Sequence, residues 1–118
     1  MAKIITDQDR SGVALTAESG GKTIESATLK NGPDNHNMVI DTSSFYKPTT
    51  AGAYPIVLAT YSIVCSKYSD TAVGQGVKSF LSVASAPQNQ GQELINAGYI
   101  PLPSDFQQKL QASINAIQ

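Results

Sequence analysis

One glycine-rich stretch of the sequence matches part of a nucleotide-binding loop. In "TAESGGKT", residues 16–23, Gly21, Lys22 and Thr23 fit the end of the pattern G-x-x-x-x-G-K-[ST]. The first glycine of that pattern would fall at position 16, where the chain has Thr16. The loop needs a backbone that turns its N–H groups toward the phosphates, which glycine permits and threonine disfavours. We therefore expect a capped helix here and no nucleotide site.

A second pair of glycines, Gly74 and Gly76, lies in "VGQGVK". The third glycine of a dinucleotide-binding fingerprint is missing, and the pair lies inside a predicted helix instead of between a strand and a helix. Close packing of that helix against a neighbouring element is the preferred interpretation.

His36 is the single histidine of the chain, in a polar loop beside Asp34. Ser43 or Ser44 could complete a Ser-His-Asp arrangement, but no G-x-S-x-G motif accompanies them. One histidine with scattered carboxylates also makes a zinc or iron site improbable. The sequence therefore predicts no catalytic residue, no metal ligand and no enzymatic activity, and it leaves His36 as a solvated loop residue.

The single cysteine, Cys65, excludes a disulfide within the chain and a cysteine-based metal cluster. We expect Cys65 to be a small core residue, since Lys67 is the one charged neighbour in sequence that could activate its thiol. The stretch "DRSG", residues 9–12, could coordinate an anion, but a turn with a local Asp–Arg pair is the preferred interpretation.

Composition restricts the classes of protein that the chain can belong to. It has 118 residues, 14% of them charged, and a formal net charge of -1, so a surface that binds nucleic acid is disfavoured and one domain is the default. No run reaches the ~18 apolar residues of a membrane span. The stretch "MAKIITDQ" lacks the pattern of a signal peptide, so we expect no targeting signal in this chain. Nothing in the composition points to a cofactor.

The first elements that the sequence predicts are a short strand over residues 2–8 and a helix from the N-cap Thr16 to about Ala27. Gly20 and Gly21 weaken that helix by roughly 1 kcal/mol each relative to alanine. A loop over 31–37 and a short strand over 38–41 follow, and 42–53 is mostly irregular. The apolar run 56–65 predicts a long strand buried on both faces, as in the middle of an α/β sheet.

Helices are expected to form the C-terminal half of the chain. The first follows Ser69 or Asp70 as its cap, the second ends at Gly98, and the third starts from Ser104 as its cap. The apolar stripe of the first helix is Val73, Val77, Phe80, Leu81 and Ala84. The stripe of the last is Phe106, Leu110, Ile114 and Ile117, with Gln107, Gln108 and Gln111 facing solvent.

Several longer stretches resemble one family of transport proteins. "AGAYPIVLATYSIVCSKY", "VKSFL", "GYIPLPSDFQQKL" and the upstream "VALTAESGGKTIESA" are similar to the C-terminal part of the phosphate-binding protein of bacterial phosphate ABC transporters, in its mycobacterial-like branch. The resemblance covers nearly the whole chain. The Tyr-Pro-Ile strand together with the later Pro-Leu-Pro is its most specific feature.

The resemblance implies part of an α/β, two-lobed fold of the periplasmic-binding-protein type, with phosphate held between the lobes. Residues 1–50 would belong to one lobe, and residues 51–118 would supply a crossing segment near 54–56 and the helices of the other. The phosphate ligands of the family would lie upstream, so no phosphate-binding residue can be assigned by number here. The parent protein would be exported, anchored by lipid to the membrane, and would deliver phosphate to an ABC permease.

Two functional hypotheses follow. In the first, the chain is the C-terminal segment of such a phosphate-binding component and serves as scaffold and lobe-closing part without the ligands. Its partners would then be the permease and the remainder of the parent chain. In the second, it is a stand-alone small α/β module whose function is association, including association with a second copy.

Overall fold

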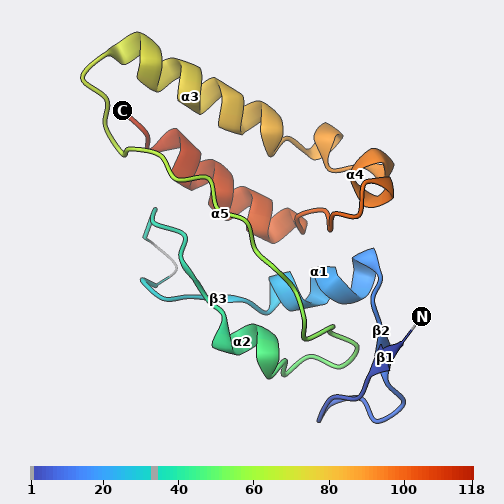
Figure 1. The fold of residues 1–118 in the computed structure, drawn as a ribbon. Coiled ribbons are helices and arrows are strands. Elements are labelled where there is room, and N and C mark those ends of the chain that lie inside the picture. Colours follow the sequence, from blue (N-terminus) through green and yellow to red (C-terminus); the bar gives the residue numbers. More distant parts are fainter. Residues whose placement is uncertain (1, 33–34) are drawn as a thin grey trace.

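The computed structural model describes residues 2–32 and 35–118 of the chain. Within them the structure is an elongated body of short strands and helices, 53 × 31 × 18 Å along its principal axes. Figure 1 shows the N-terminal part, with its small sheets, on one side of helix α5 and helix α3 on the other. The mixture of helix and small sheets agrees with the predicted α/β class.

The first small sheet joins β1 (Lys3–Ile4) to β2 (Val13–Ala14) in an antiparallel register that pairs Lys3 with Ala14. Gly12 allows the turn before β2 because its φ of 83° lies in the left-handed region that favours glycine. The predicted strand 2–8 is therefore confirmed over two residues. β2 was not predicted, because two residues are too few to show an alternating pattern.

Helix α1 (Ala17–Glu25) starts as predicted at Thr16. The Ser19 N–H donates to Thr16 Oγ1 at 3.0 Å, and the Thr16 N–H donates to Ser19 Oγ at 2.9 Å. This reciprocal capping box satisfies two N–H groups that a helix start would otherwise leave unpaired. Helix formation here owes more to the cap and to burial than to propensity, since Gly20 and Gly21 lie in the middle of the helix and are buried.

The second small sheet joins β3 (Thr28–Leu29) to β4 (Ile40–Asp41), again antiparallel. β4 confirms the second half of the strand predicted over 38–41, whereas β3 was not anticipated. Part of the loop predicted over 31–37, Pro33 and Asp34, lies outside the described residues. The stretch expected to be irregular contains one further element, the single-turn helix α2 (Ser43–Tyr46).

The N-terminal core forms where α1 meets the segment around Tyr54. Thr23 is fully buried and its Oγ1 donates to the Tyr54 carbonyl at 2.7 Å, while the Tyr54 N–H donates to the Ser19 carbonyl at 3.0 Å. Ala53, which precedes Tyr54, is buried, and so is Phe45 of α2. The segment after Ala53 is thus fixed to α1 by two backbone groups that would otherwise remain unpaired.

The predicted long buried strand over 56–65 is wrong for this chain. Residues 56–65 are extended but belong to no strand, and most of their side chains are exposed, including that of Cys65. The apolar run favours a sheet interior, but a strand exists only where neighbouring strands take up its backbone hydrogen bonds. Among the described residues, the strands are two residues long and pair only with each other.

The C-terminal half is helical, as predicted. α3 (Thr71–Ala84) begins at Asp70, whose carboxylate accepts from the Ala72 N–H at 2.8 Å. It packs beside α5 (Ser104–Asn115), and the two run in opposite directions in Figure 1. Between them lie a 3-10 turn (η1, Pro87–Asn89) and α4 (Gln92–Asn96). Gly98, at φ 87°, ends α4 as the sequence predicted.

The start of α5 differs from the prediction. Ser104 is the first helical residue, Pro103 precedes it, and no side chain caps the helix. Serine could have capped this end, but the proline fixes the backbone one residue earlier and shifts the helix start.

The predicted apolar stripe of α5 points toward the interior. Ile114 and Ile117 are buried, and Phe106 and Leu110 are half-buried. The glutamines differ from expectation: Gln111 Nε2 donates to Ser85 Oγ at 2.7 Å, and Gln107 Nε2 donates to the Leu102 carbonyl at 2.7 Å. Only Gln108 is exposed as predicted.

The C-terminal residue holds the end of the extended run. The Gln118 N–H donates to the Ser66 carbonyl at 2.9 Å, and the Tyr68 N–H donates to the Gln118 carbonyl at 2.7 Å. In the described part of the chain, no helix is both long enough and apolar enough to cross a membrane.

The two glycines of α1 provide a test of this packing. A Cβ at Gly20 would collide with the Ile100 side chain, whereas a Cβ at Gly21 would meet nothing within 4 Å. Gly21→Ala should therefore raise the free energy of unfolding by about 1 kcal/mol through helix propensity. Gly20→Ala should give no such gain or should destabilise the chain, and adding Ile100→Val should recover part of the difference. Chemical denaturation measures all three, and equal gains at both glycines would refute the α1–Ile100 contact.

Candidate functional site

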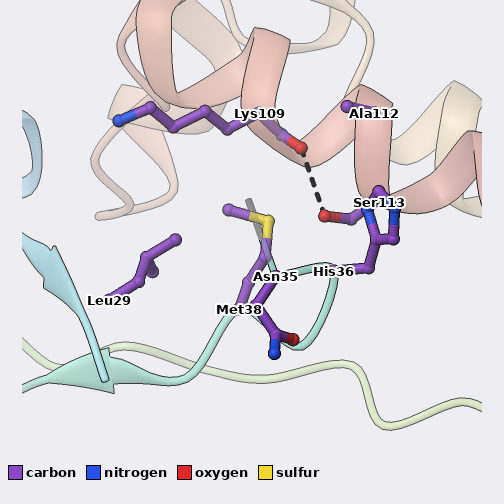
Figure 2. A pocket seen from close by; sticks show the side chains of 7 residues that line it. All are labelled: Leu29, Asn35, His36, Met38, Lys109, Ala112 and Ser113. Atoms are coloured by element: carbon purple, nitrogen blue, oxygen red, sulfur yellow. Dashed lines mark hydrogen bonds between the residues drawn. The ribbon is translucent and has the colours of Figure 1, made fainter. Parts of the chain in front are cut away.

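One small cavity lies between the chain around β3 and β4 and helix α5. Its volume is about 220 Å³, and Figure 2 shows the seven side chains that line it. The polar ones are Asn35, His36, Lys109 and Ser113, and the apolar ones are Leu29, Met38 and Ala112. The Lys109 and Ser113 side chains share one face of α5 because they are four residues apart.

The arrangement in this cavity provides little chemistry. Ser113 Oγ donates to the Lys109 carbonyl at 3.2 Å, so its hydroxyl already has a partner within the helix. In Figure 2 the Lys109 side chain extends away from the end of the cavity where His36 lies. Among the described lining residues there is no carboxylate, so none of them can orient His36 as a base. The cavity could admit a small molecule, but its described side chains form no catalytic constellation.

Sequence reasoning named His36 but missed the rest of this cavity. The i, i+4 spacing of Lys109 and Ser113 could have placed those two on one face of a helix. Nothing local could have brought that face to Leu29 and Met38, which lie 71 to 84 residues earlier in the chain.

The residues of the partial nucleotide-loop motif have structural partners. Lys22 Nζ lies 2.9 Å from Glu18 Oε1 in an i, i+4 ion pair, and the Thr23 hydroxyl is buried and donates to the Tyr54 carbonyl. A phosphate loop would need both groups directed at a ligand. The prediction of a capped helix is thus confirmed. A shallow groove of about 360 Å³ lies over this part of α1, and residues 101–103 line it from the other side.

The serines considered as partners of His36 are engaged elsewhere. Ser43 Oγ donates to Asp41 Oδ1 at 2.8 Å, and Ser44 Oγ donates to the Asp41 carbonyl at 2.7 Å. His36 itself is exposed, as predicted. Asp34, the third residue of the Ser-His-Asp arrangement considered from the sequence, lies outside the described residues. The structure therefore does not bring these serines and His36 together into a catalytic arrangement.

The stretch 9–12 forms a local turn. The Ser11 hydroxyl and N–H donate to Asp9 Oδ1 at 2.6 and 2.9 Å. These bonds, the hydroxyl first, hold the pKa of the Asp9 carboxyl below its ordinary value, with a smaller contribution from the charge of Lys3. The turn is confirmed, but its carboxylate bonds to Ser11 rather than to Arg10.

Cys65 is exposed, so its expected place in the core is wrong. The cause is the same as for the run that contains it, since no strand among the described residues pairs with residues 56–65. Lys67, proposed as its neighbour, is also exposed.

The two glycines of α3 have different environments. A Cβ at Gly74 would lie 3.3 Å from the Gln118 carbonyl oxygen, so close packing is confirmed there. A Cβ at Gly76 would meet nothing within 4 Å, so the packing interpretation is wrong at that position. Among residues 2–32 and 35–118, no group of three His, Cys, Asp or Glu side chains is placed to hold a metal ion.

The chain is similar to known phosphate-binding proteins of mycobacteria. Over 117 residues, 99% of its length, it is 51% identical to phosphate-binding protein PstS 2 of Mycobacterium tuberculosis. It is 47% identical over 116 residues to phosphate-binding protein PstS 3 of Mycobacterium leprae and 48% identical over 117 residues to PstS3 of Mycobacterium bovis. No protein-family model matches the chain.

These relatives confirm the resemblance named from the sequence. The chain spans only 30% of the length of the curated relatives it matches. Within that span the described residues form a capped helix, turns and small cavities.

Titration of Asp41 tests the local bonding at α2. The Ser43 hydroxyl and N–H hold the pKa of Asp41 below its ordinary value, the hydroxyl contributing most and Lys30 least. Ser43→Ala should raise this pKa toward the ordinary value, whereas Ser44→Ala, which removes a bond to the backbone carbonyl, should leave it unchanged. NMR titration of the carboxyl carbons measures both.

The sign of the linked stability effect follows from the lowered pKa. Because the folded-state pKa lies below the unfolded one, the stabilisation is present above the unfolded pKa and is lost as the pH falls through the folded pKa. Equal shifts in the two variants would contradict the assigned hydroxyl bond.

Proposed function

We propose that this chain is the C-terminal segment of a phosphate-binding component of an ABC transporter for inorganic phosphate. The observation that carries the proposal is 51% identity, over nearly the whole chain, to a longer protein whose name describes phosphate binding. Residues 1–50 would contribute to one lobe and 51–118 to a crossing segment and the other lobe. The relatives' names describe binding proteins, which supports a non-enzymatic role.

The segment would act as scaffold and would help to close the lobes without supplying the phosphate ligands. A desolvated phosphate dianion needs several N–H and O–H donors together with a cationic partner. In the described residues, the hydroxyls of Thr23, Ser43 and Ser44 donate to the chain itself. Lys22 is paired with Glu18, and Arg10 is exposed and is the one arginine of the sequence. Because these groups already have partners within the chain, they support the proposal that the phosphate ligands lie in the rest of the longer protein.

The parent protein would be exported, held at the outer face of the membrane by a lipid, and would deliver phosphate to an ABC permease. This part of the proposal rests on the family resemblance of the sequence. The alternative function, a self-associating module, has one observation in its favour: large apolar side chains of Leu58, Ile63 and Phe80 are exposed.

Phosphate binding separates the two functions. Isothermal titration calorimetry at low salt should give millimolar or weaker affinity for the 118-residue chain alone. Grafted in place of the matching 117 residues of M. tuberculosis PstS 2, the same chain should restore phosphate binding to within ~10-fold of that protein. Lack of binding by a well-folded graft would refute the proposed function.

A matched variant controls for the cavity around His36. His36→Ala in the graft should leave phosphate affinity unchanged, because the proposed ligands lie outside this chain. Micromolar phosphate binding by the 118-residue chain, lost on His36→Ala, would place the site in this cavity and overturn the scaffold role.

A further inference from the structure

Asn31 and Gly32 form the one asparagine–glycine pair of the sequence, and they lie in the turn that follows β3. We propose that Asn31 is a site of spontaneous modification, at which the side chain cyclises onto the Gly32 backbone nitrogen, loses ammonia and is hydrolysed to aspartate and isoaspartate. The nucleophile, the reacting carbon and the leaving group all belong to these two residues, and the one co-reactant is water. The inference concerns the chemistry of this chain and does not depend on the proposed function.

The Asn31 side chain is exposed to solvent and weakly held. Its Nδ2 donates to the Asn37 carbonyl at 3.4 Å, which is longer than the usual N–H···O distance of about 2.7–3.2 Å. Such a bond restrains the amide little, so the side chain can turn its carbonyl carbon toward the next backbone nitrogen. Water can reach the same carbon because the residue lies at the surface.

Gly32 leaves the attacking nitrogen accessible. It has no side chain, and apart from its chain neighbours a Cβ at this position would meet no described residue within 4 Å. A larger residue would place its Cβ beside the nitrogen that must approach the Asn31 side chain. Because nucleophile and carbon are joined by the chain itself, the reaction that closes the five-membered ring is intramolecular and is favoured by proximity.

One hydrogen bond opposes the reaction. The Gly32 N–H donates to the Leu29 carbonyl at 3.2 Å and closes the turn over Lys30 and Asn31. This bond must open before the nitrogen can attack. The adjoining sheet has two residues in each strand, and so small a two-stranded sheet is marginally stable and opens locally. The turn therefore slows the reaction relative to a free peptide without preventing it.

The atoms of the reaction balance. The Gly32 nitrogen gives its proton to a base in solution and forms a bond to Cγ of Asn31. The Cγ–Nδ2 bond breaks, and the amide nitrogen takes up a proton and leaves as ammonia, so a cyclic imide remains. Water then adds its OH to one imide carbonyl carbon and its proton to the nitrogen. Attack at Cγ leaves aspartate, whereas attack at the main-chain carbonyl carbon of Asn31 leaves isoaspartate.

The other asparagines of the chain provide internal controls. Each is followed by a residue with a side chain, and they are Asn35, Asn37, Asn89, Asn96 and Asn115. Asn35 and Asn37 are exposed and lie in the same loop as Asn31, so they share its access to solvent. They differ in the following residue, which is His36 or Met38 in place of glycine.

The modification would change the chain between β3 and β4. Either product adds a negative charge beside Lys30 to a chain whose formal net charge is -1. Isoaspartate also carries the main chain through its Cβ and Cγ, which lengthens the turn by one atom and misaligns the Gly32 N–H with the Leu29 carbonyl. Residues 35, 36 and 38, which follow this turn, line the cavity beside α5, so the modification would alter that cavity as well.

Incubation of the 118-residue chain near neutral pH, followed by peptide mass spectrometry with fragmentation, tests the proposal. Asn31 should convert to a mixture of aspartate and isoaspartate roughly tenfold or more faster than Asn35 and Asn37. A synthetic peptide of residues 28–37, incubated in parallel, shows that the time allowed is sufficient. Unchanged Asn31 in the chain after the peptide has converted would overturn the proposal, and so would conversion of Asn35 or Asn37 at the rate of Asn31.

Gly32→Ala supplies a second measurement. Gly32 has a φ of 84°, which alanine disfavours, so the substitution should loosen the turn and by that effect alone expose the nitrogen and speed the reaction. The added Cβ should instead slow the conversion of Asn31 roughly tenfold or more by hindering the attack. A slower reaction therefore cannot result from loosening of the turn. A rate equal to or above that of the unsubstituted chain would overturn the role of Gly32 and the proposal with it.

Discussion

The buried hydroxyl of Thr23 connects the parts of this structure that lie far apart in sequence. It donates to the Tyr54 carbonyl at 2.7 Å, and the neighbouring Ser19 carbonyl accepts the Tyr54 N–H at 3.0 Å. A hydroxyl without exposure to water must have such a partner, since an unpaired one would cost about 1–3 kcal/mol. The same helix meets Ile100 at Gly20, so α1 positions both the start of the extended run and the approach to α5.

Residues 56–65 are mostly exposed because α1 contacts the chain before this run and does not cover the run itself. α1 and Gln118 fix residues 54 and 66–68, and the apolar chain between them has no strand beside it in the described part of the molecule. A sheet needs at least three strands with an apolar face, or a covering helix, before it is stable by itself. Strands of two residues do not meet that need. The chain therefore folds locally and leaves its most apolar stretch exposed.

The polar groups explain why the small cavities remain without evident chemistry. Several serine, threonine and aspartate side chains bond to backbone two to five residues away, as in the capping box of Thr16 and the turns at Asp9 and Asp41. Such local bonds stabilise turns and helix ends, and the groups that make them are not available to a ligand. Identity to longer phosphate-binding proteins and this use of polar groups support the same scaffold role.

The sequence by itself determined the features that depend on neighbours within a few residues. The caps at Thr16 and Asp70, the stop at Gly98 and the stripe that buries Ile114 and Ile117 are such features, because each is decided within one or two helical turns. Only the tertiary structure decided the exposure of Cys65, the bond from Gln111 to Ser85, the close contact at Gly74 and the cavity that joins His36 to α5. Each of these depends on residues at least 26 positions apart, or on strands that the chain does not have beside residues 56–65. Apolar patterning predicts that a segment should be buried, but only the remaining elements of the fold determine whether anything covers it.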